Sequence, residues 1–266
     1  YTVTALRILL SHERYDLIWC GHIGMAPLAR MAAARYQCPW WLQIHGIDAW
    51  DRPGALKRWA VKSAALITAV SRFTRRRFLA WSMLAPEQVR VLPDTVDECF
   101  TPGPKPAHLL KRHGLDGKRM LLTVGRISAA ENYKGHDRVI KLLPELLKRH
   151  PDAFYVIAGD GDGQPALEHL AKHLGVKDAC RFVGKIDDPN LVDLYRMADV
   201  FVMPSIGEGF GIVYLEAMAC GIPAIGLDVD GSIDPLGALP DGRAVPEHLL
   251  LETICDSLEE AASGAS

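Results

Sequence analysis

The amino-acid sequence predicts an α/β protein with parallel sheets, and two observations carry this prediction. Short apolar runs alternate with helical patterns almost throughout, as in βαβ units. A stretch from Pro93 to Pro106 holds four prolines in fourteen residues, which neither a helix nor a central strand tolerates. The chain of 266 residues is long enough for two modest domains. We therefore expect a linker here and a domain boundary between residues 97 and 98.

The first alternating series predicts the back half of a Rossmann-like domain over residues 1–97. Its apolar runs predict strands at 16–20, 41–45, 65–70 and 89–92. Its helical periodicity predicts helices at 3–12, 25–36, 53–63 and 72–82. The sequence begins at Tyr1 rather than Met, inside the first of these helices, so we expect a fragment whose true N-terminus is missing.

The second series predicts a complete Rossmann-like domain over residues 98–266. Strands are expected at 120–124, 154–158, 181–183, 200–203 and 224–227. Helices are expected at 136–150, 166–174 and 190–198, through Glu216–Cys220, and at about 246–260. Ligands of open parallel sheets bind beyond the carboxyl ends of the strands. The loops at those ends are therefore expected to converge on one cleft.

Composition narrows the class of protein. Hydrophobic residues make up 49% and charged residues 23%, which is ordinary for a globular protein, and the formal net charge of −2 does not favour nucleic acid as a partner. Six cysteines without paired spacing predict reduced thiols in a cytosolic protein. The sequence shows neither a signal peptide nor an apolar run of membrane-spanning length.

The most informative segment runs from Pro204 to Glu216. Glu208 and Glu216 stand eight residues apart, between a buried strand and a helix. Gly209 and Gly211 allow the backbone to approach a ligand and leave N–H groups at a helix N-terminus. Two carboxylates in one cleft also suit general acid/base chemistry. The structural alternative makes Glu208 a helix-start charge and Glu216 part of a solvated face.

A second candidate loop, Gly125–Gly135, follows the strand at 120–124. Arg126 and Lys134 carry charges that suit a diphosphate. The alternative is that Lys134 is a solvated lysine in the first turn of a helix.

The pattern Gly161-x-Gly163-x-x-Ala166 formally fits the dinucleotide fingerprint, but three features oppose that interpretation. Asp160 and Asp162 would repel a pyrophosphate, Pro165 removes a helix-start N–H, and the loop follows the second strand of its domain rather than the first. We predict a tight turn, and a nucleotide-dependent oxidoreductase is disfavoured.

The order Glu-Gly-Phe-Gly-x4-Glu-Ala from Glu208 resembles the Glu-x7-Glu motif of retaining nucleotide-sugar glycosyltransferases of family 4. The Gly-Arg…Lys-Gly pair of the 125–135 loop is similar to that family's, with a spacing two residues longer. The resemblance covers nearly the whole chain and is strongest from Val89 to Val245. It implies the GT-B architecture of two Rossmann-like domains, an incomplete acceptor-side domain over 1–97 and a donor-binding domain over 98–266.

The resemblance also implies roles for residues. Arg126 and Lys134 would grip the donor diphosphate, Glu208 the hydroxyls of the donor sugar and Glu216 those of the ribose. The expected catalytic residues are His45, Arg126, Lys134 and Glu208. The expected donor-binding residues are Gly125, Arg126, Lys134, Ile186, Asp188, Glu208, Gly209, Phe210, Gly211, Ile212 and Glu216.

Some of these assignments have structural alternatives. Ile186 and Asp188 would contact the base, although Asp187 or Asp188 equally suits a helix cap. His45, followed by Gly46, would face the transferred sugar, whereas a lone His at a strand end is more often structural. His22 is a weaker candidate for the acceptor side. Gly231 or Ser232 would contact the donor.

The implied function is retaining transfer from a nucleoside-diphosphate sugar to a saccharide or lipid-linked acceptor, with no metal and no cofactor. GDP-mannose is the favoured donor, by similarity to bacterial mannosyltransferases, and UDP-sugars are the alternative. Rival functions are an epimerase or phosphorylase of the same architecture, or a non-catalytic nucleotide-binding module. The family's Gly-rich loop and closing helix lie outside the sequence, so we expect the fragment to be inactive alone.

A basic run, Arg72–Arg77, opens the helix after Ser71. Its ordinary interpretation is a solvated face. The alternative is peripheral contact with the inner face of a membrane that carries the acceptor.

Overall fold

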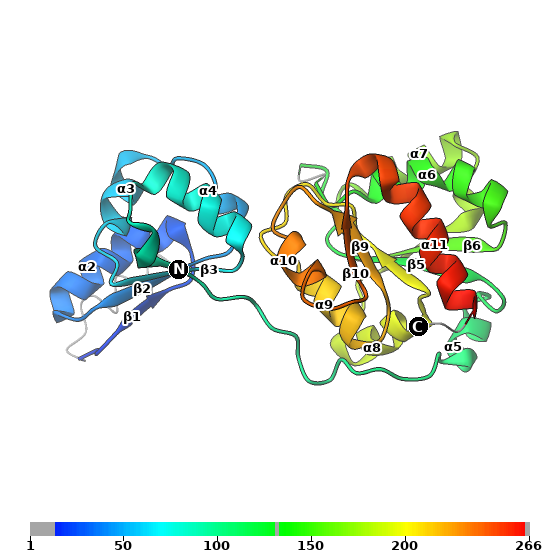
Figure 1. Ribbon diagram of the computed structural model, residues 1–266, viewed down its shortest axis with the longest axis horizontal. Helices are drawn as coiled ribbons and strands as arrows, with labels where there is room; N and C mark the ends of the chain where they lie inside the picture. The colour runs from blue at the N-terminus through cyan, green and yellow to red at the C-terminus, as the bar shows by residue number, and fades with distance from the viewer. Residues whose placement is uncertain (1–13, 131–132, 264–266) are drawn as a thin grey trace. The chain divides into compact units, whose positions relative to one another are not determined.

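The structure is a computed structural model that describes residues 14–130 and 133–263. The predicted helix at 3–12 lies outside the described residues. The chain divides into two compact units, Tyr1–Asp94 and Thr95–Ser266 (Figure 1). The sequence prediction placed the boundary between 97 and 98.

The first unit is built on a parallel sheet of order β1-β2-β3-β4. Alternation along β2 turns Trp40, Leu42 and Ile44 into the core, where they meet Ile67 and Ala69 of β3. The strands are β1 (Ile18–Cys20), β2 (Trp40–Ile44), β3 (Leu66–Ala69) and β4 (Val89–Val91). The helices between them are α2 (Ala26–Tyr36), α3 (Ala55–Val61) and α4 (Arg72–Ser82).

The second unit is built on a parallel six-stranded sheet of order β10-β9-β8-β5-β6-β7. Counted from β5, this is the 3-2-1-4-5-6 order of a Rossmann sheet. The strands are β5 (Arg119–Val124), β6 (Ala153–Ala158), β7 (Cys180–Gly184), β8 (Val200–Val202), β9 (Ala224–Leu227) and β10 (Gly242–Val245). The strand order reverses between β5 and β8, so the loops after these two strands flank the crevice where such sheets bind ligands.

Helices cover both faces of this sheet (Figure 1). One core cluster packs α6, α7 and α11 on one face, and the other packs α8, α9 and α10 on the opposite face. Leu121 of β5 contributes to the first cluster, while Met120 and Leu122 contribute to the second. Burial on both faces explains why these strands read as continuous apolar runs. The helices are α5 (Ala107–Arg112), α6 (His136–Arg149), α7 (Gln164–His173), α8 (Asp188–Met197), α9 (Ile212–Ala219), α10 (Ile233–Leu236) and α11 (Leu250–Ser263).

In the described part of the second unit, the α-helices α5 and α10 and the strand β10 were not predicted. The two helices span six and four residues, too few to show a helical period. Strand β10 is a half-buried edge strand that contains Arg243, so it lacks the apolar run that marks central strands. The stretch from 92 to 106 contains neither helix nor strand, as the prolines predicted.

Among the described residues, no helix is both long enough and apolar enough to cross a bilayer. All six cysteines are free.

Candidate functional site

The loops after β5 and β8 meet through a buried ion pair. Lys134 Nζ donates to Glu208 Oε1 at 2.6 Å, and the two side chains are only 18% and 11% exposed. The Ile206 N–H donates to the Tyr133 carbonyl at 2.9 Å, which ties the two backbones together. The sequence predicted both charged residues for one cleft but not their pairing. An ammonium has three donors and a carboxylate two acceptors, so the pair can hold a ligand and itself at once.

Asp230 fixes the backbone that carries Glu208. This buried aspartate accepts the Glu208 N–H at 2.7 Å through Oδ2 and the Ser232 N–H at 2.9 Å through Oδ1. The Gly231 N–H donates in turn to the Glu208 carbonyl at 2.8 Å. Burial raises the pKa of Asp230, while the hydrogen bonds from Ser232 oppose that shift. The N–H groups of Gly231 and Ser232, predicted to touch a donor, thus have partners within the protein.

Asp230 itself was missed as a functional residue. Its signal in the sequence was the Asp-Gly-Ser order, in which an aspartate bonds the backbone two residues on.

We call the hydrogen bonds that Asp230 accepts from Glu208 and Ser232 the Asp230 brace. Helix α9 begins at Ile212, four residues after Glu208. Gly211 is its N-cap in the left-handed conformation, with φ of 88°, and a Cβ there would overlap the Tyr214 ring. Gly209 and Phe210 are buried, whereas Ile212 is exposed at the first helical position. The structure therefore needs the glycine that the motif supplies at position 211.

Glu216 lies one turn further along α9 and is half-buried. Its Oε2 accepts a hydrogen bond from the hydroxyl of Tyr195 at 2.6 Å. Tyr195, on α8, is completely buried. No sequence pattern predicts this contact, because the two residues come from helices separated by a strand and a loop.

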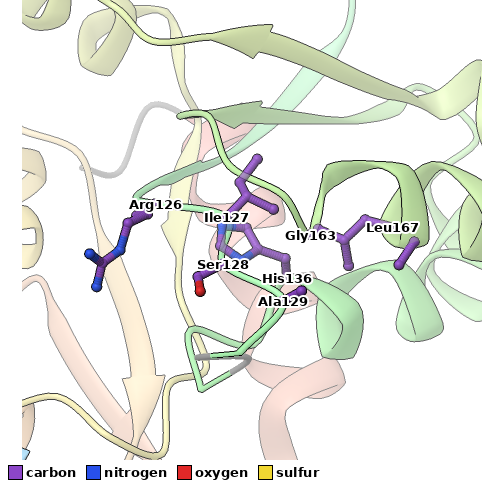
Figure 2. Close-up of a pocket in the computed structure, with 8 residues that line it drawn as sticks. Arg126, Ile127, Ser128, Ala129, His136, Gly163 and Leu167 are labelled. Atoms are coloured by element: carbon purple, nitrogen blue, oxygen red, sulfur yellow. The ribbon is translucent and has the colours of Figure 1, made fainter.

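The loop after β5 also lines a pocket of about 130 Å³ (Figure 2). The side chain of Arg126 is exposed and extends away from the Leu167 end of this pocket. His136, the first residue of α6, is 2% exposed and lines the pocket with an unpartnered Nε2. Its burial, reinforced by the charge of Lys134, lowers its pKa to about 4. His136 is therefore neutral at pH 7, beside the lysine of the ion pair.

The glycine-rich loop after β6 supports the loop after β5. The Ile127 N–H donates to the Asp160 carbonyl at 2.9 Å, and the Gly163 N–H donates to the Ile127 carbonyl at 3.0 Å. The Ala129 N–H donates to Asp162 Oδ1 at 2.9 Å. A Cβ at Gly161 would overlap the Ile127 carbonyl oxygen. The glycines thus allow two backbones to touch, which agrees with the predicted tight turn rather than a dinucleotide site.

The residues predicted to contact the base lie after β7. Ile186 is half-buried and packs against the core cluster beneath α8 and α9. Asp188 is the first residue of α8, and its side chain lies outside the described part of the chain. Asp187 occupies the N-cap position, but its carboxylate accepts no capping hydrogen bond.

In the first unit, polar side chains follow β1, β2 and β4. His45 is exposed after β2. Asp94 follows β4, and burial raises its pKa, while the charge of His45 opposes that rise. His22 Nδ1 accepts the Gly24 N–H at 2.9 Å, and its Nε2 lies 3.6 Å from Asp48 Oδ2. His22 therefore caps a short 3-10 turn, a structural role that the sequence did not predict.

Two arginines of the basic run at the start of α4 make polar contacts within the first unit. Arg75 donates to the carbonyls of Val89 and Pro86, both at 2.7 Å. Arg77 pairs with Asp51 at 3.0 Å. Arg75 therefore has a structural role, whereas Arg72, Arg76 and Arg77 are exposed, as expected for a solvated face.

Metal ligands do not gather here in the part of the chain that the structure describes: no group of three His, Cys, Asp or Glu side chains there is arranged to hold an ion.

A Rossmann sheet preceded by a second parallel α/β unit is the architecture called GT-B. Solved structures agree on the fold. A HepE structure from Anabaena in complex with UDP has a TM-score of 0.84 at 19% identity, over 96% of this chain and 72% of that one. A glycosyltransferase from Rickettsia africae has a TM-score of 0.79 at 19% identity, over 97% of this chain and 70% of that one.

Sequence comparisons give the family. Residues 108–261 match the family described as "Glycosyl transferases group 1", and residues 1–99 match "Glycosyltransferase Family 4". The chain belongs to these glycosyltransferases.

Two relatives carry more specific names. A GDP-mannose-dependent alpha-(1-6)-phosphatidylinositol monomannoside mannosyltransferase of Mycolicibacterium smegmatis is 34% identical over 83% of this chain and 60% of its own length. A GDP-mannose-dependent monoacylated alpha-(1-6)-phosphatidylinositol monomannoside mannosyltransferase of Corynebacterium glutamicum is 30% identical over 100% of this chain and 74% of its own length.

Proposed function

We propose that the protein transfers a sugar from a nucleoside-diphosphate sugar to a saccharide or lipid-linked acceptor, with retention of configuration and without a metal ion. The observation that carries the proposal is the Lys134–Glu208 pair at the switch point of the second sheet. The names of the relatives favour GDP-mannose as the donor. UDP-sugars are the alternative, since the Anabaena structures hold UDP and UDP-glucose.

The reaction places a charge requirement on the site. The bond between the anomeric carbon and the phosphate oxygen breaks, and the acceptor oxygen bonds to the same carbon from the leaving-group side. The acceptor proton passes to a phosphate oxygen of the departing diphosphate. Arg126 and Lys134 supply positive charge for that diphosphate, and the N-terminus of α9 adds its dipole. No step needs a protein nucleophile.

In this proposal two carboxylates accept hydrogen bonds from the hydroxyl groups of the donor. Glu208 would accept from the donor sugar and Glu216 from the ribose, because both oxygens of a carboxylate are acceptors. Gly125, Ile186 and Asp188 would complete the diphosphate and base contacts. His45 is proposed for the acceptor side.

Nucleotide binding tests the donor site directly. We expect GDP to raise the melting temperature more than UDP or ADP, because a ligand that binds only the folded state stabilises it. Glu216→Ala should lose most of that increase. A chain that no nucleotide stabilises, or a Glu216→Ala variant that binds as well as the parent, contradicts the assignment.

A lipid-linked acceptor requires the enzyme to reach a membrane, and we propose a cytoplasmic enzyme that touches the inner leaflet through α3. Leu56 and Trp59 of this helix are 63% and 47% exposed. The Arg30 guanidinium stacks on Trp59 at 3.7 Å, and Lys62 is exposed just beyond. Helices α2, α3 and α4 contain no Asp or Glu. Exposed apolar side chains among cations suit an anionic bilayer.

Vesicle flotation tests this surface. We expect the protein to float with vesicles that contain phosphatidylglycerol and to be released as salt screens the lipid charge. Leu56→Ser with Trp59→Ser should abolish flotation. Met83→Ser, which removes another exposed apolar side chain, is the matched control and should float like the parent. Equal flotation of all variants would refute the α3 assignment.

A further inference from the structure

The linker is fastened to the second unit along its final part. Arg196 of α8 donates to the Thr101 carbonyl through Nη2 at 2.8 Å and to the Thr101 hydroxyl at 2.9 Å. Lys105 Nζ pairs with Asp199 Oδ1 at 2.5 Å, while Asp199 Oδ2 accepts the Met120 N–H at 2.7 Å. An irregular stretch rich in proline thus follows a fixed path over α8.

Phe100 is the apolar contact of this strap, by which we mean residues 100–105. Its ring packs edge-on against Tyr195, with centroids 5.8 Å apart, and Phe201 of β8 lies 5.8 Å from the same tyrosine. Aromatic contacts favour some ring orientations over others, and Tyr195 is completely buried between these two rings. The strap and the sheet together therefore fix the Tyr195 ring.

The fixed ring aims its hydroxyl at Glu216. The O–H donates to Oε2 at 2.6 Å, a short hydrogen bond to a charged acceptor. Burial raises the pKa of Tyr195 well above its ordinary value, and the charge of Glu216 raises it further, so the group stays a donor at all physiological pH. A glutamate on a helix has three rotatable bonds, and this bond selects one of its orientations.

We propose that Tyr195 is a positioning residue, which orients the Glu216 carboxylate toward the two vicinal hydroxyls of a nucleotide ribose. The inference rests on the proposed function, which assigns the ribose to Glu216. The strap takes part through Phe100, six residues beyond Asp94, the last residue of the first unit. Residues of the linker therefore help to shape the ribose site.

The test measures by calorimetry how tightly the full chain binds GDP and 2′,3′-dideoxy-GDP. If the parent binds UDP more tightly than GDP, UDP and its dideoxy form replace them. We expect Tyr195→Phe to weaken GDP binding about tenfold, the loss of roughly one charge-assisted hydrogen bond, and to leave dideoxy-GDP unchanged. Phe100→Ala should act in the same direction with a smaller effect. In the Glu216→Gln background, Tyr195→Phe should have no further effect, because the two residues act as one unit.

Tyr155→Phe is the matched control. Tyr155 is equally buried, and its hydroxyl bonds the Thr123 hydroxyl at 2.8 Å. Its variant should lose stability without losing ribose discrimination.

The outcomes separate the two levels of the proposal. A parent that prefers GDP, with a Tyr195→Phe variant that keeps the same preference, overturns the positioning role alone. A Tyr195→Phe variant that binds both ligands less well by the same factor also overturns it, since the effect is then structural. A parent that binds the two ligands equally overturns the ribose assignment itself.

Discussion

At the scale of single residues, the Lys134–Glu208 pair combines stability with binding. Removing one charge leaves the other buried without a partner, which costs more than the intact pair contributes. We expect Lys134→Met to destabilise the second unit by about 1–3 kcal/mol and to abolish nucleotide binding. Denaturant melts of the parent, Lys134→Met and Lys134→Met/Glu208→Gln measure this, and the double variant should regain stability without regaining binding.

Lys148→Met is the control for that comparison. Lys148 pairs with Glu145 at 2.6 Å on α6, with side chains 72% and 54% exposed, and such pairs contribute about 0.3–0.5 kcal/mol. If Lys134→Met proved as mild as Lys148→Met, the Lys134–Glu208 pair would be energetically equivalent to an exposed one.

His136 gives the protein a pH-dependent stability. Its pKa falls from 6.5 to about 4 on folding, so below pH 6.5 the unfolded chain binds a proton that the folded chain does not. Stability contributed by this residue is complete above pH 6.5 and is lost as pH falls toward 4, by up to about 3 kcal/mol. We expect His136→Gln to flatten the fall in melting temperature between pH 7 and pH 5.

The exposed His169 supplies the comparison for this pH series. His169→Gln should keep the slope of the parent. An unchanged slope in His136→Gln would show that other groups cause the loss.

At the scale of elements, the glycine loop after β6 explains why the loop after β5 holds its shape. Gly159 and Gly161 have φ of 137° and 149°, where side chains are strained, and a Cβ at either would overlap a backbone carbonyl of residues 125–127. We expect Gly161→Ala to cost more than about 2 kcal/mol and to weaken nucleotide binding by displacing Ile127 from its place beside Arg126. Thermal melts with and without GDP measure both effects.

Gly175→Ala separates backbone strain from loop displacement. Gly175 also has a positive φ, of 71°, but a Cβ there meets open space. Its variant should lose about 1 kcal/mol and bind GDP like the parent. Equal GDP binding by Gly161→Ala and Gly175→Ala would show that the glycine loop does not contribute to nucleotide binding.

The elements also show what the sequence could reveal. Strands such as β6 and β9 are buried on both faces, so apolar runs in the sequence predict them. Helix α4 and strand β9 begin and end at the predicted residues. The charged residues of the site were found because their loops follow such strands. The Asp-Gly-Ser order indicates the local bond from Asp230 to Ser232, but the bonds from Asp230 to Glu208 and from Tyr195 to Glu216 join residues 22 and 21 positions apart, which no local pattern encodes.

At the scale of the whole molecule, the small net charge conceals two opposite ones. Residues 1–94 hold thirteen Lys or Arg and six Asp or Glu, a balance of +7, whereas residues 95–266 hold seventeen and twenty-six, a balance of −9. The sum, −2, gave no hint of a charged partner. The segregation suits the proposed enzyme, whose first unit would meet an anionic surface and whose second would hold its ligand through Arg126 and Lys134 rather than through a basic face.

The two units also have separate hydrophobic cores, which predicts that the second unit folds and binds nucleotide without the first. Among the described residues, each hydrophobic core cluster draws its members from one unit. The Lys134–Glu208 pair, the Asp230 brace and the Tyr195–Glu216 bond all lie after residue 94. A unit with its own core can fold alone. We expect residues 95–266, expressed alone, to unfold in one cooperative transition and to bind GDP within about threefold of the full chain, a difference of roughly 0.7 kcal/mol.

A version that starts at residue 107 lacks the strap. Because Tyr195 then loses its contact with Phe100, this version should bind GDP more weakly than 95–266. Calorimetry on the two versions decides the matter: equal affinities would show that the strap contributes nothing to the ribose site, and failure of 95–266 to bind would show that the first unit supplies part of the donor site.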